Sequence, residues 1–195
     1  GDILLPGKYA PDNPPEELRV FIYLDSEDRL VATTQTPVVT VEQFAYLEAV
    51  DRTPVGVFLD WGLDKDLLVP FREQQTPMAP GQFYLVYVYL DTLTDRIVAS
   101  SKVNHYISET CPAFEYKQEV DLLICERNEL GYDVIIDDCY WGMLYANELF
   151  QPVNRGQRFK GYIKKVREDE RVDVCLQKPG YERIEGTSET VLTKL

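Results

Sequence analysis

Apolar and polar positions alternate over short stretches of the chain, and clusters of Pro, Gly, Asp and Asn separate these stretches. Such alternation, bounded by turn residues, is typical of half-buried β-strands. Three segments share a longer pattern of strand, acidic turn, Arg and second strand. They are residues 23–37 (YLDSEDRLVATTQTP), 89–103 (YLDTLTDRIVASSKV) and 165–179 (KVREDERVDVCLQKP). The pattern therefore predicts the same hairpin three times.

The spacing of these hairpins predicts the size of the repeated unit. The Arg that follows each turn is Arg29, Arg96 or Arg171, and successive copies lie about 70 residues apart, which suits a small barrel of five short strands. A second element recurs at matching distance, as LLP at 4–6, LVP at 68–70 and MLY at 143–145. The repeat is thus a domain rather than a short solenoid unit.

We therefore expect an all-β fold of tandem five-stranded OB-fold barrels. The expected segments are an incomplete barrel at 1–37, complete barrels at 38–104 and 105–180, and a linker with the start of a helical domain at 181–195, where Thr187-Ser188-Glu189 resembles a helix cap. The predicted strands are 44–52, 55–61, 66–71, 82–90 and 96–102, then 119–127, 132–136, 140–145, 157–166 and 171–177. In the incomplete barrel, Phe21, Tyr23 and Val31 should have apolar neighbours that are missing or come from another chain.

Composition narrows the function. The net charge of −13 opposes binding to a polyanion, so any RNA site must be a local basic or aromatic patch. The four cysteines form no C-x-x-C pair and there is a single histidine, a composition that predicts no zinc site, no cofactor and reduced thiols in a cytoplasmic protein. No apolar run approaches the roughly 18 residues of a membrane span.

Several long strings resemble the conserved virulence factor B family of bacterial proteins, which has S1-like barrels and a C-terminal winged helix. The strings are ILLPGKYAP, VFIYLDSEDRLVATT, VGVFLDWGLDKDLLVPFREQ, YLDTLTDRIVAS, NELGYDVIIDDCYWGMLYANELFQP and GQRFKGYIKKVREDERVDVCLQ. They span nearly the whole chain. The resemblance implies RNA binding, a role in gene regulation and a winged helix after residue 180.

The resemblance also implies residues of an RNA-binding face. S1 barrels typically carry an aromatic residue before the Gly of a G-x-F strand, the Phe of that motif, a His on the third strand, and an Asp and an Arg around the last turn. The matching residues are Phe58, Asp91 and Arg96 in the middle copy, Asp25 and Arg29 in the first, and Arg171 in the last. The departures are Val55 and Pro70 in the middle copy, Pro6 in the first, and Tyr145 and Arg167 in the last.

Other aromatic and basic residues are candidates on chemistry alone. Trp61, placed three residues after Phe58 on one predicted strand, and Tyr140, Trp141 and Tyr145 can stack on bases, although packing explains strand aromatics equally well. The densest basic stretch includes Lys160, Lys164, Lys165, Arg167 and Arg171. It is either a phosphate track or a solvated edge that resists aggregation. If it is a track, the last barrel supplies most phosphate contacts.

No constellation of residues suggests catalysis, because His105 is alone and no nucleophile elbow or phosphate-binding Gly-rich loop occurs. We therefore expect a non-enzymatic regulatory protein that binds single-stranded RNA through several weak sites acting together. The alternative is a protein-binding adaptor that uses the same aromatic faces. It is consistent with the acidic surface.

Overall fold

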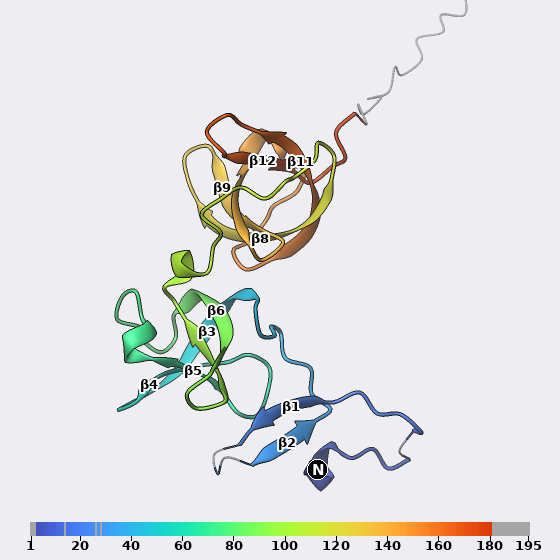
Figure 1. The fold of residues 1–195 in the computed structure, drawn as a ribbon, viewed down its shortest axis with the longest axis vertical. Helices are drawn as coiled ribbons and strands as arrows, with labels where there is room; N and C mark the ends of the chain where they lie inside the picture. The colour runs from blue at the N-terminus through green and yellow to red at the C-terminus, as the bar shows by residue number, and fades with distance from the viewer. Residues whose placement is uncertain (1–2, 14, 26, 28, 181–195) are drawn as a thin grey trace, which may run out of the picture.

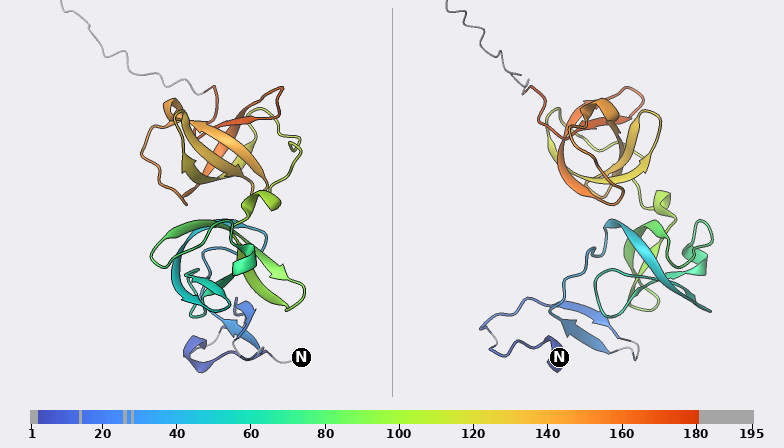
Figure 2. Two further views of the ribbon diagram at one scale, coloured as in Figure 1. Left: turned by 90° about the vertical axis from the view of Figure 1, so that its left-hand side faces the viewer. Right: turned by 180° about the vertical axis from the view of Figure 1, so that it is seen from behind.

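The computed structural model describes residues 3–13, 15–25, 27 and 29–180, and regular structure in this part of the chain consists of β-strands and four 3₁₀ turns. Three β-sheets follow one another along the sequence and are stacked along the long axis of the molecule (Figures 1 and 2). No helix among the described residues is long and apolar enough to cross a membrane. The expectation of an all-β protein is confirmed for these residues.

The N-terminal sheet is a two-stranded hairpin, β1 (Phe21–Leu24) and β2 (Leu30–Thr33), with a parallel bridge from Leu4 to Val31. Phe21 and Tyr23 pack on the core of the next sheet, and the Phe21 ring meets the edge of Trp61 at a centroid distance of 5.6 Å. The missing neighbours of this hairpin therefore come from the same chain, contrary to the expectation of a truncated face or a second chain.

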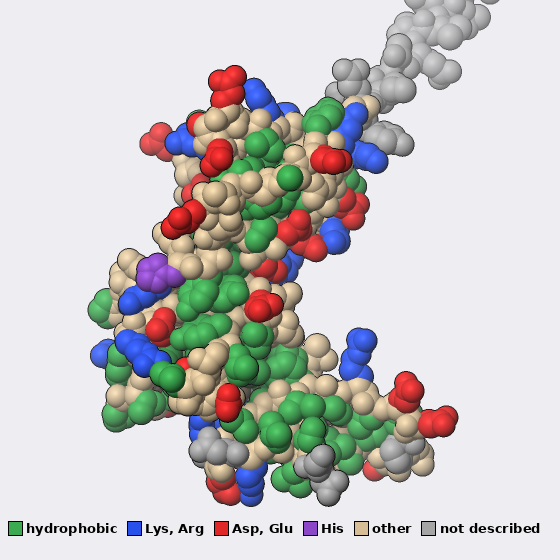
Figure 3. All heavy atoms as spheres, viewed as in Figure 1, with side chains coloured by type: hydrophobic (Ala, Val, Ile, Leu, Met, Phe, Trp, Pro, Cys, Tyr) green, Lys and Arg blue, Asp and Glu red, His purple; other side chains and the backbone are tan. Residues whose placement is uncertain are grey.

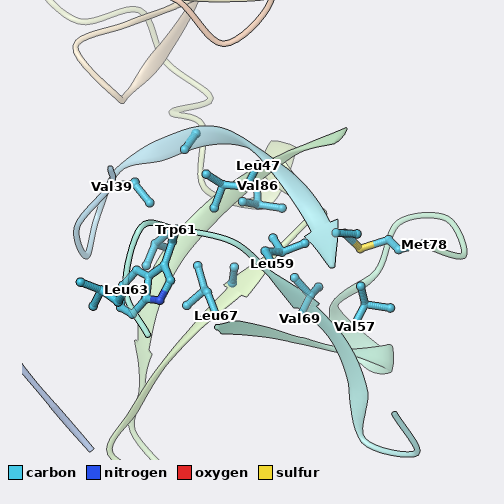
Figure 4. Close-up of a cluster of buried hydrophobic side chains, with 14 residues drawn as sticks. Val39, Leu47, Val57, Leu59, Trp61, Leu63, Leu67, Val69, Met78 and Val86 are labelled. Atoms are coloured by element: carbon cyan, nitrogen blue, oxygen red, sulfur yellow. The ribbon is translucent and has the colours of Figure 1, made fainter. Parts of the chain in front are cut away.

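The middle sheet has the strand order β5-β4-β3-β6-β7. Its strands are β3 (Phe44–Thr53), β4 (Gly56–Leu59), β5 (Leu67–Pro70), β6 (Phe83–Asp91) and β7 (Arg96–Ser100). A bulge between Ala49 and Asp51 lets β3 curve so that it pairs with β4 at one end and β6 at the other. The enclosed side chains, including Leu59, Trp61 and Leu67, form one apolar cluster (Figure 4).

The last sheet is a closed barrel with the order β10-β12-β11-β8-β9. Its strands are β8 (Glu119–Arg127), β9 (Gly131–Ile136), β10 (Tyr140–Tyr145), β11 (Arg158–Val166) and β12 (Val172–Cys175). Parallel pairing of β10 with β12 closes the barrel, as Met143 pairs with Asp173. Inside it, Leu122, Ile124, Leu144 and Ile163 are fully buried.

A 3₁₀ turn follows the same element in each repeat. These turns are η1 (Gly7–Tyr9), η2 (Phe71–Glu73) and η4 (Ala146–Glu148), which come directly after the recurring triplets at 4–6, 68–70 and 143–145. A further turn, η3 (Val103–His105), lies between the middle sheet and the last barrel. The recurrence of η1, η2 and η4 supports a common architecture for all three copies.

The middle sheet and the last barrel are joined by an apolar contact. Phe44 of β3 is fully buried in a cluster with Leu123, Cys125 and Ile135 of the last barrel. The backbone of Phe44 adds two hydrogen bonds: its N–H donates to Asp138 Oδ1 at 2.9 Å and its carbonyl accepts from Arg158 Nη2 at 2.6 Å. Burial also raises the pKa of the Cys125 thiol to about 12, so this thiol stays protonated at neutral pH.

The predicted strands agree with the observed ones to within a few residues. β4 ends at Leu59, two residues earlier than predicted, which leaves Trp61 in the following loop. The exact borders of the segments 1–37, 38–104 and 105–180 stay predictions. The expected start of a winged-helix domain at 181–195 lies outside the described residues.

Candidate nucleic-acid interface

Glycine begins the second strand of both complete repeats for the same steric reason. A Cβ on Gly56 would lie 2.3 Å from the carbonyl oxygen of Val69, and one on Gly131 would lie 2.1 Å from that of Leu144. A side chain at either position would push the neighbouring strand away. The glycine therefore fixes the register of the second and third strands, which aligns the residues that follow it in the two repeats.

This alignment defines one surface in each complete repeat. The middle face consists of Val55, Phe58, Leu68, Arg96 and Val98. The distal face consists of the equivalent residues Leu130, Asp133, Met143, Arg171 and Asp173. In the ladders, Phe58 pairs with Leu68 as Asp133 pairs with Met143. Each face lines a depression, of about 370 Å³ in the middle repeat and about 350 Å³ in the last.

The middle depression is mainly apolar and carries cations at its border. Half-buried Phe58 lines it with Leu68 and Val98, and Tyr23 and Leu24 of the N-terminal hairpin line it as well. Lys65 and Arg96 also line it. Lys65 Nζ donates to the Leu24 carbonyl at 2.5 Å, which ties the hairpin to the rim. A ring, apolar walls and cations are what a stacked nucleotide requires.

One acid, Asp66, lies in the same depression. Partial burial and, to a lesser degree, the negative charges of Asp60 and Asp51 raise its pKa above the usual value. Asp66 is therefore protonated more readily than an exposed aspartate, and protonation removes a negative charge beside Phe58.

A second depression extends the middle face beyond Arg96. It shares Val55, Leu68, Arg96 and Val98 with the first and adds Phe71, Arg72, Asp91 and Thr94. Phe71 is 42% exposed, and the Arg52 guanidinium lies 5.6 Å from the centre of its ring. The middle repeat thus offers two aromatic rings with arginines near both.

The acids of the hairpin turns have a structural role. Asp91 accepts hydrogen bonds from the Leu93 N–H at 3.1 Å and from Thr94 Oγ1 at 3.0 Å, which shapes the turn before Arg96. Asp25 accepts from the backbone of Arg29 at 3.0 Å and from its guanidinium at 2.6 and 2.9 Å. These bonds lower the pKa of Asp25 to about 2. Both acids hold their turns, as Asx residues commonly do.

The distal face has the same shape but a different chemistry, because acids replace Phe58 and Val98. Asp173 is only 8% exposed and binds Arg167, whose Nε donates to Asp173 Oδ2 at 2.9 Å. The Arg167 Nη2 also donates to the Tyr145 hydroxyl, and the guanidinium lies 5.8 Å from the centre of that ring. The predicted candidates Tyr145, Arg167 and Arg171 therefore meet at one depression, with Arg167 already held by an acid.

The basic stretch of β11 is largely neutralised by acids from neighbouring segments. Lys160, which pairs in register with Asp121, lies 2.9 Å from its carboxylate, and Lys164 forms an ion pair with Glu148. Among the described residues Lys165 has no ion-pair partner. In Figure 3, acidic and basic side chains are intermixed over the upper part of the molecule, which is the last barrel. A continuous open track of positive charge is thus absent from this stretch, and the role of its lysines in RNA binding stays a prediction.

The aromatic candidates predicted from the sequence differ in burial and in their contacts. Trp61 is 3% exposed, points into the middle core in Figure 4, and donates from Nε1 to the Lys65 carbonyl at 2.6 Å. Its burial contradicts the expectation of a stacking surface there, because β4 ends before it and the loop turns it inward. Tyr140 packs near Phe114 and donates to the Glu170 carbonyl at 3.0 Å. Trp141 reaches both the inter-barrel cluster and the distal depression.

Sequence reasoning missed Tyr23, Lys65, Asp66, Asp133 and Asp173 as lining residues. Aligning residues by their distance from Gly56 and Gly131 would have found Asp133. The place of Tyr23 required the docking of the hairpin, which no local pattern indicates. Among the described residues, no group of three or more His, Cys, Asp or Glu side chains is arranged to hold a metal ion.

The five-stranded sheets, the shared glycine and the repeated faces are consistent with barrels of the OB-fold type. Residues 1–35 match the family model of the S1 domain. These residues correspond to the incomplete first repeat.

The chain is similar to the uncharacterized protein YitL of Bacillus subtilis (strain 168), with 29% identity over 187 residues, covering 91% of this chain and 62% of YitL. It also matches a crystal structure of a multidomain protein with nucleic acid binding domains from Streptococcus pneumoniae, with 20% identity and a TM-score of 0.42, covering 90% of this chain and 65% of that one. The chain thus spans less than two thirds of either protein.

Proposed function

We propose that the chain binds single-stranded RNA without catalysing a reaction, and that the middle face is its principal contact. One observation carries the proposal. In the middle repeat, the face that matches the S1 pattern holds a half-buried Phe58, apolar walls and the cations Lys65 and Arg96 in one depression of about 370 Å³. A ring on a strand accepts any base, and the cations meet the phosphates beside it.

The match of residues 1–35 to the S1 domain supports a nucleic acid as the ligand. A role in regulation, and membership of the virulence factor B family that the sequence resembles, belong to the same proposal. With a net charge of −13, the body of the protein repels RNA, so binding must depend on these local faces.

The proposal also specifies how the ligand approaches. The N-terminal hairpin closes one side of the depression, because Tyr23 and Leu24 face the sheet that holds Phe58. In a duplex, each base is already stacked on its neighbours and is not open to the Phe58 ring. In an unpaired strand, the bases can turn outward and stack on this ring. The middle face therefore favours single strands.

A salt titration with a labelled single-stranded RNA of about 16 nucleotides, the upper end of the range for one OB-fold site, tests the proposal. Affinity should fall as salt rises, with a slope of about 0.7 per phosphate contact, and a duplex of the same sequence should compete poorly. Binding that ignores salt, or no binding to any RNA, would favour the protein-binding adaptor instead.

A further inference from the structure

The distal face differs from the middle face at the position that matters most for a stacked base. Asp133 occupies the place of Phe58: each is the second residue after the strand-starting glycine, and each pairs with the equivalent residue of the next strand. The change replaces a ring, which stacks on every base, by a carboxylate, which accepts hydrogen bonds. A face with a carboxylate at this position favours ligands that carry suitably placed hydrogen-bond donors.

The distal face has acceptors that the protein does not satisfy. Asp133 Oδ1 accepts from Asn128 Nδ2 at 3.0 Å, whereas its Oδ2 accepts no hydrogen bond from the residues that the structure describes. Asp173 lines the same depression, is 8% exposed, and has a buried Oδ1 that lacks any hydrogen-bond partner within the described chain. The buried Asp173 Oδ1 adds negative charge beneath the depression, whereas Asp133 Oδ2 is the acceptor that a ligand bringing donors can pair with.

The remaining walls suit a flat, aromatic ligand. Trp141, Met143, Leu130 and Tyr145 surround the depression, and Arg171 lies at its border. The two carboxylates repel a phosphate that enters the depression, because like charges repel. The arrangement instead receives a base whose ring contacts the apolar walls and whose edge turns its donors toward the acids.

We propose that the distal face is a base-reading site that selects guanine in single-stranded RNA, an inference that rests on the proposed function. Guanine carries two adjacent donors on its Watson–Crick edge, N1–H and the N2 amino group, which match the two oxygens of a carboxylate. Adenine, cytosine and uracil each have one donor group there. The guanine O6 accepts, so Arg171 is a suitable partner for it. The middle face then binds bases without sequence preference, and the distal face positions the RNA strand by binding one guanine.

The test uses the 195-residue chain and labelled oligouridylates of about 16 nucleotides that carry one central guanosine, inosine, adenosine or uridine. Inosine lacks only the N2 amino group of guanosine. The guanosine probe should bind about tenfold more tightly than the uridine probe, which corresponds to one good base contact, and inosine should lose most of this gain. Asp133→Asn, which exchanges an acceptor for a donor at constant shape, should reduce the preference for guanosine over uridine to about twofold or less.

Asp12→Asn is the matched control, since Asp12 is exposed and lies outside both faces. Circular dichroism and a thermal melt establish that each variant is folded. A wild-type chain that binds all four probes equally overturns the inference and leaves the proposed function standing. A guanosine preference that survives Asp133→Asn also overturns it.

Failure to bind any of the four probes removes the proposed function itself, so the two failures are distinguishable. If an arginine-rich peptide binds the wild type, and Asp133→Asn abolishes that binding without changing the RNA preference, the distal face is a protein-docking site and the inference is wrong.

Discussion

The middle and distal faces lie on the same scaffold and present nearly opposite chemistry. Both begin at a glycine that lets two strands approach, and both precede a 3₁₀ turn. At equivalent positions, however, Phe58 and Val98 of one face correspond to Asp133 and Asp173 of the other. The glycines and the turns that set the strand geometry recur in both repeats, whereas the residues that line the depressions differ.

The comparison teaches that a cluster of basic residues is a weaker indication of an RNA site than the face on which they lie. Arg167 belongs to the densest basic stretch, but it is held by Asp173 and Tyr145. Arg96 lies outside that basic stretch, yet it lines both depressions of the middle face. The surroundings of an arginine determine how strongly it attracts phosphate.

The largest expected effect is a loss of stability when the contact between the middle sheet and the last barrel is removed. Phe44→Ala removes a fully buried ring from the inter-barrel cluster and should lower the free energy of unfolding by about 3–5 kcal/mol. Urea unfolding should then show two transitions, one for each barrel. The exposed, stacked Phe83 is the control, and Phe83→Ala should change stability by less than about 1 kcal/mol. Equal effects of the two changes would show that the barrels are not joined at Phe44.

The next effect concerns stacking on the middle face. Phe58→Ala should weaken binding of single-stranded RNA by about 1–3 kcal/mol, the value of one stacked base, with little change in salt slope because stacking releases no counterions. Phe150, which is 58% exposed and outside both faces, provides the matched control Phe150→Ala. Fluorescence anisotropy measures both. Equal affinities for the two variants would refute the assignment of Phe58.

A smaller effect distinguishes the charges of the two repeats. Arg96→Gln should lower the salt slope by about 0.7 of a unit, as one lost phosphate contact does for single strands. The double change of Lys160 and Lys164 to Ala should lower it by less, because these lysines lie on β11, outside the depressions of both faces. Titration of RNA binding between low and moderate salt measures both slopes. The reverse order would restore the last barrel as the main phosphate contact.

The smallest effect is a dependence on pH. The pKa of Asp66 is raised by partial burial and by neighbouring acids, so its carboxylate gains a proton at a higher pH than an exposed aspartate. Protonation removes a negative charge from the middle depression, and RNA affinity should therefore rise modestly as pH falls from neutral toward this pKa. Asp66→Asn should bind at neutral pH as the wild type does at lower pH, with a flatter profile. An affinity that falls on acidification in both proteins would contradict this role.

The strands were predictable because the alternation of side chains and the turn residues both repeat. The hairpin pattern located β1–β2, β6–β7 and β11–β12 from sequence alone, since each acidic turn is followed by an Arg and a regular strand. Trp61 is a residue whose position the alternation did not predict. Period two extended β4 through it, but the strand ends at Leu59 and the tryptophan packs inward from a loop.

The candidate site was less predictable, because it depends on pairs of segments that are distant in sequence. Phe58 and Arg96 were identified, but Tyr23 reaches them only through docking of the hairpin. Lys160 looked like part of a track until the register placed Asp121 opposite it. Local sequence indicates which residues are charged, while cross-strand neighbours decide whether that charge is available.

The central claim is that RNA lies on the middle face, and photo-crosslinking tests it most directly. A single-stranded RNA containing 4-thiouridine is irradiated with the full chain, and mass spectrometry then locates the modified peptides. We predict crosslinks on β4 and β5 around Phe58 and Leu68, and on the opposing wall at Tyr23. Crosslinks confined to β11, with none in the middle repeat, would contradict the account.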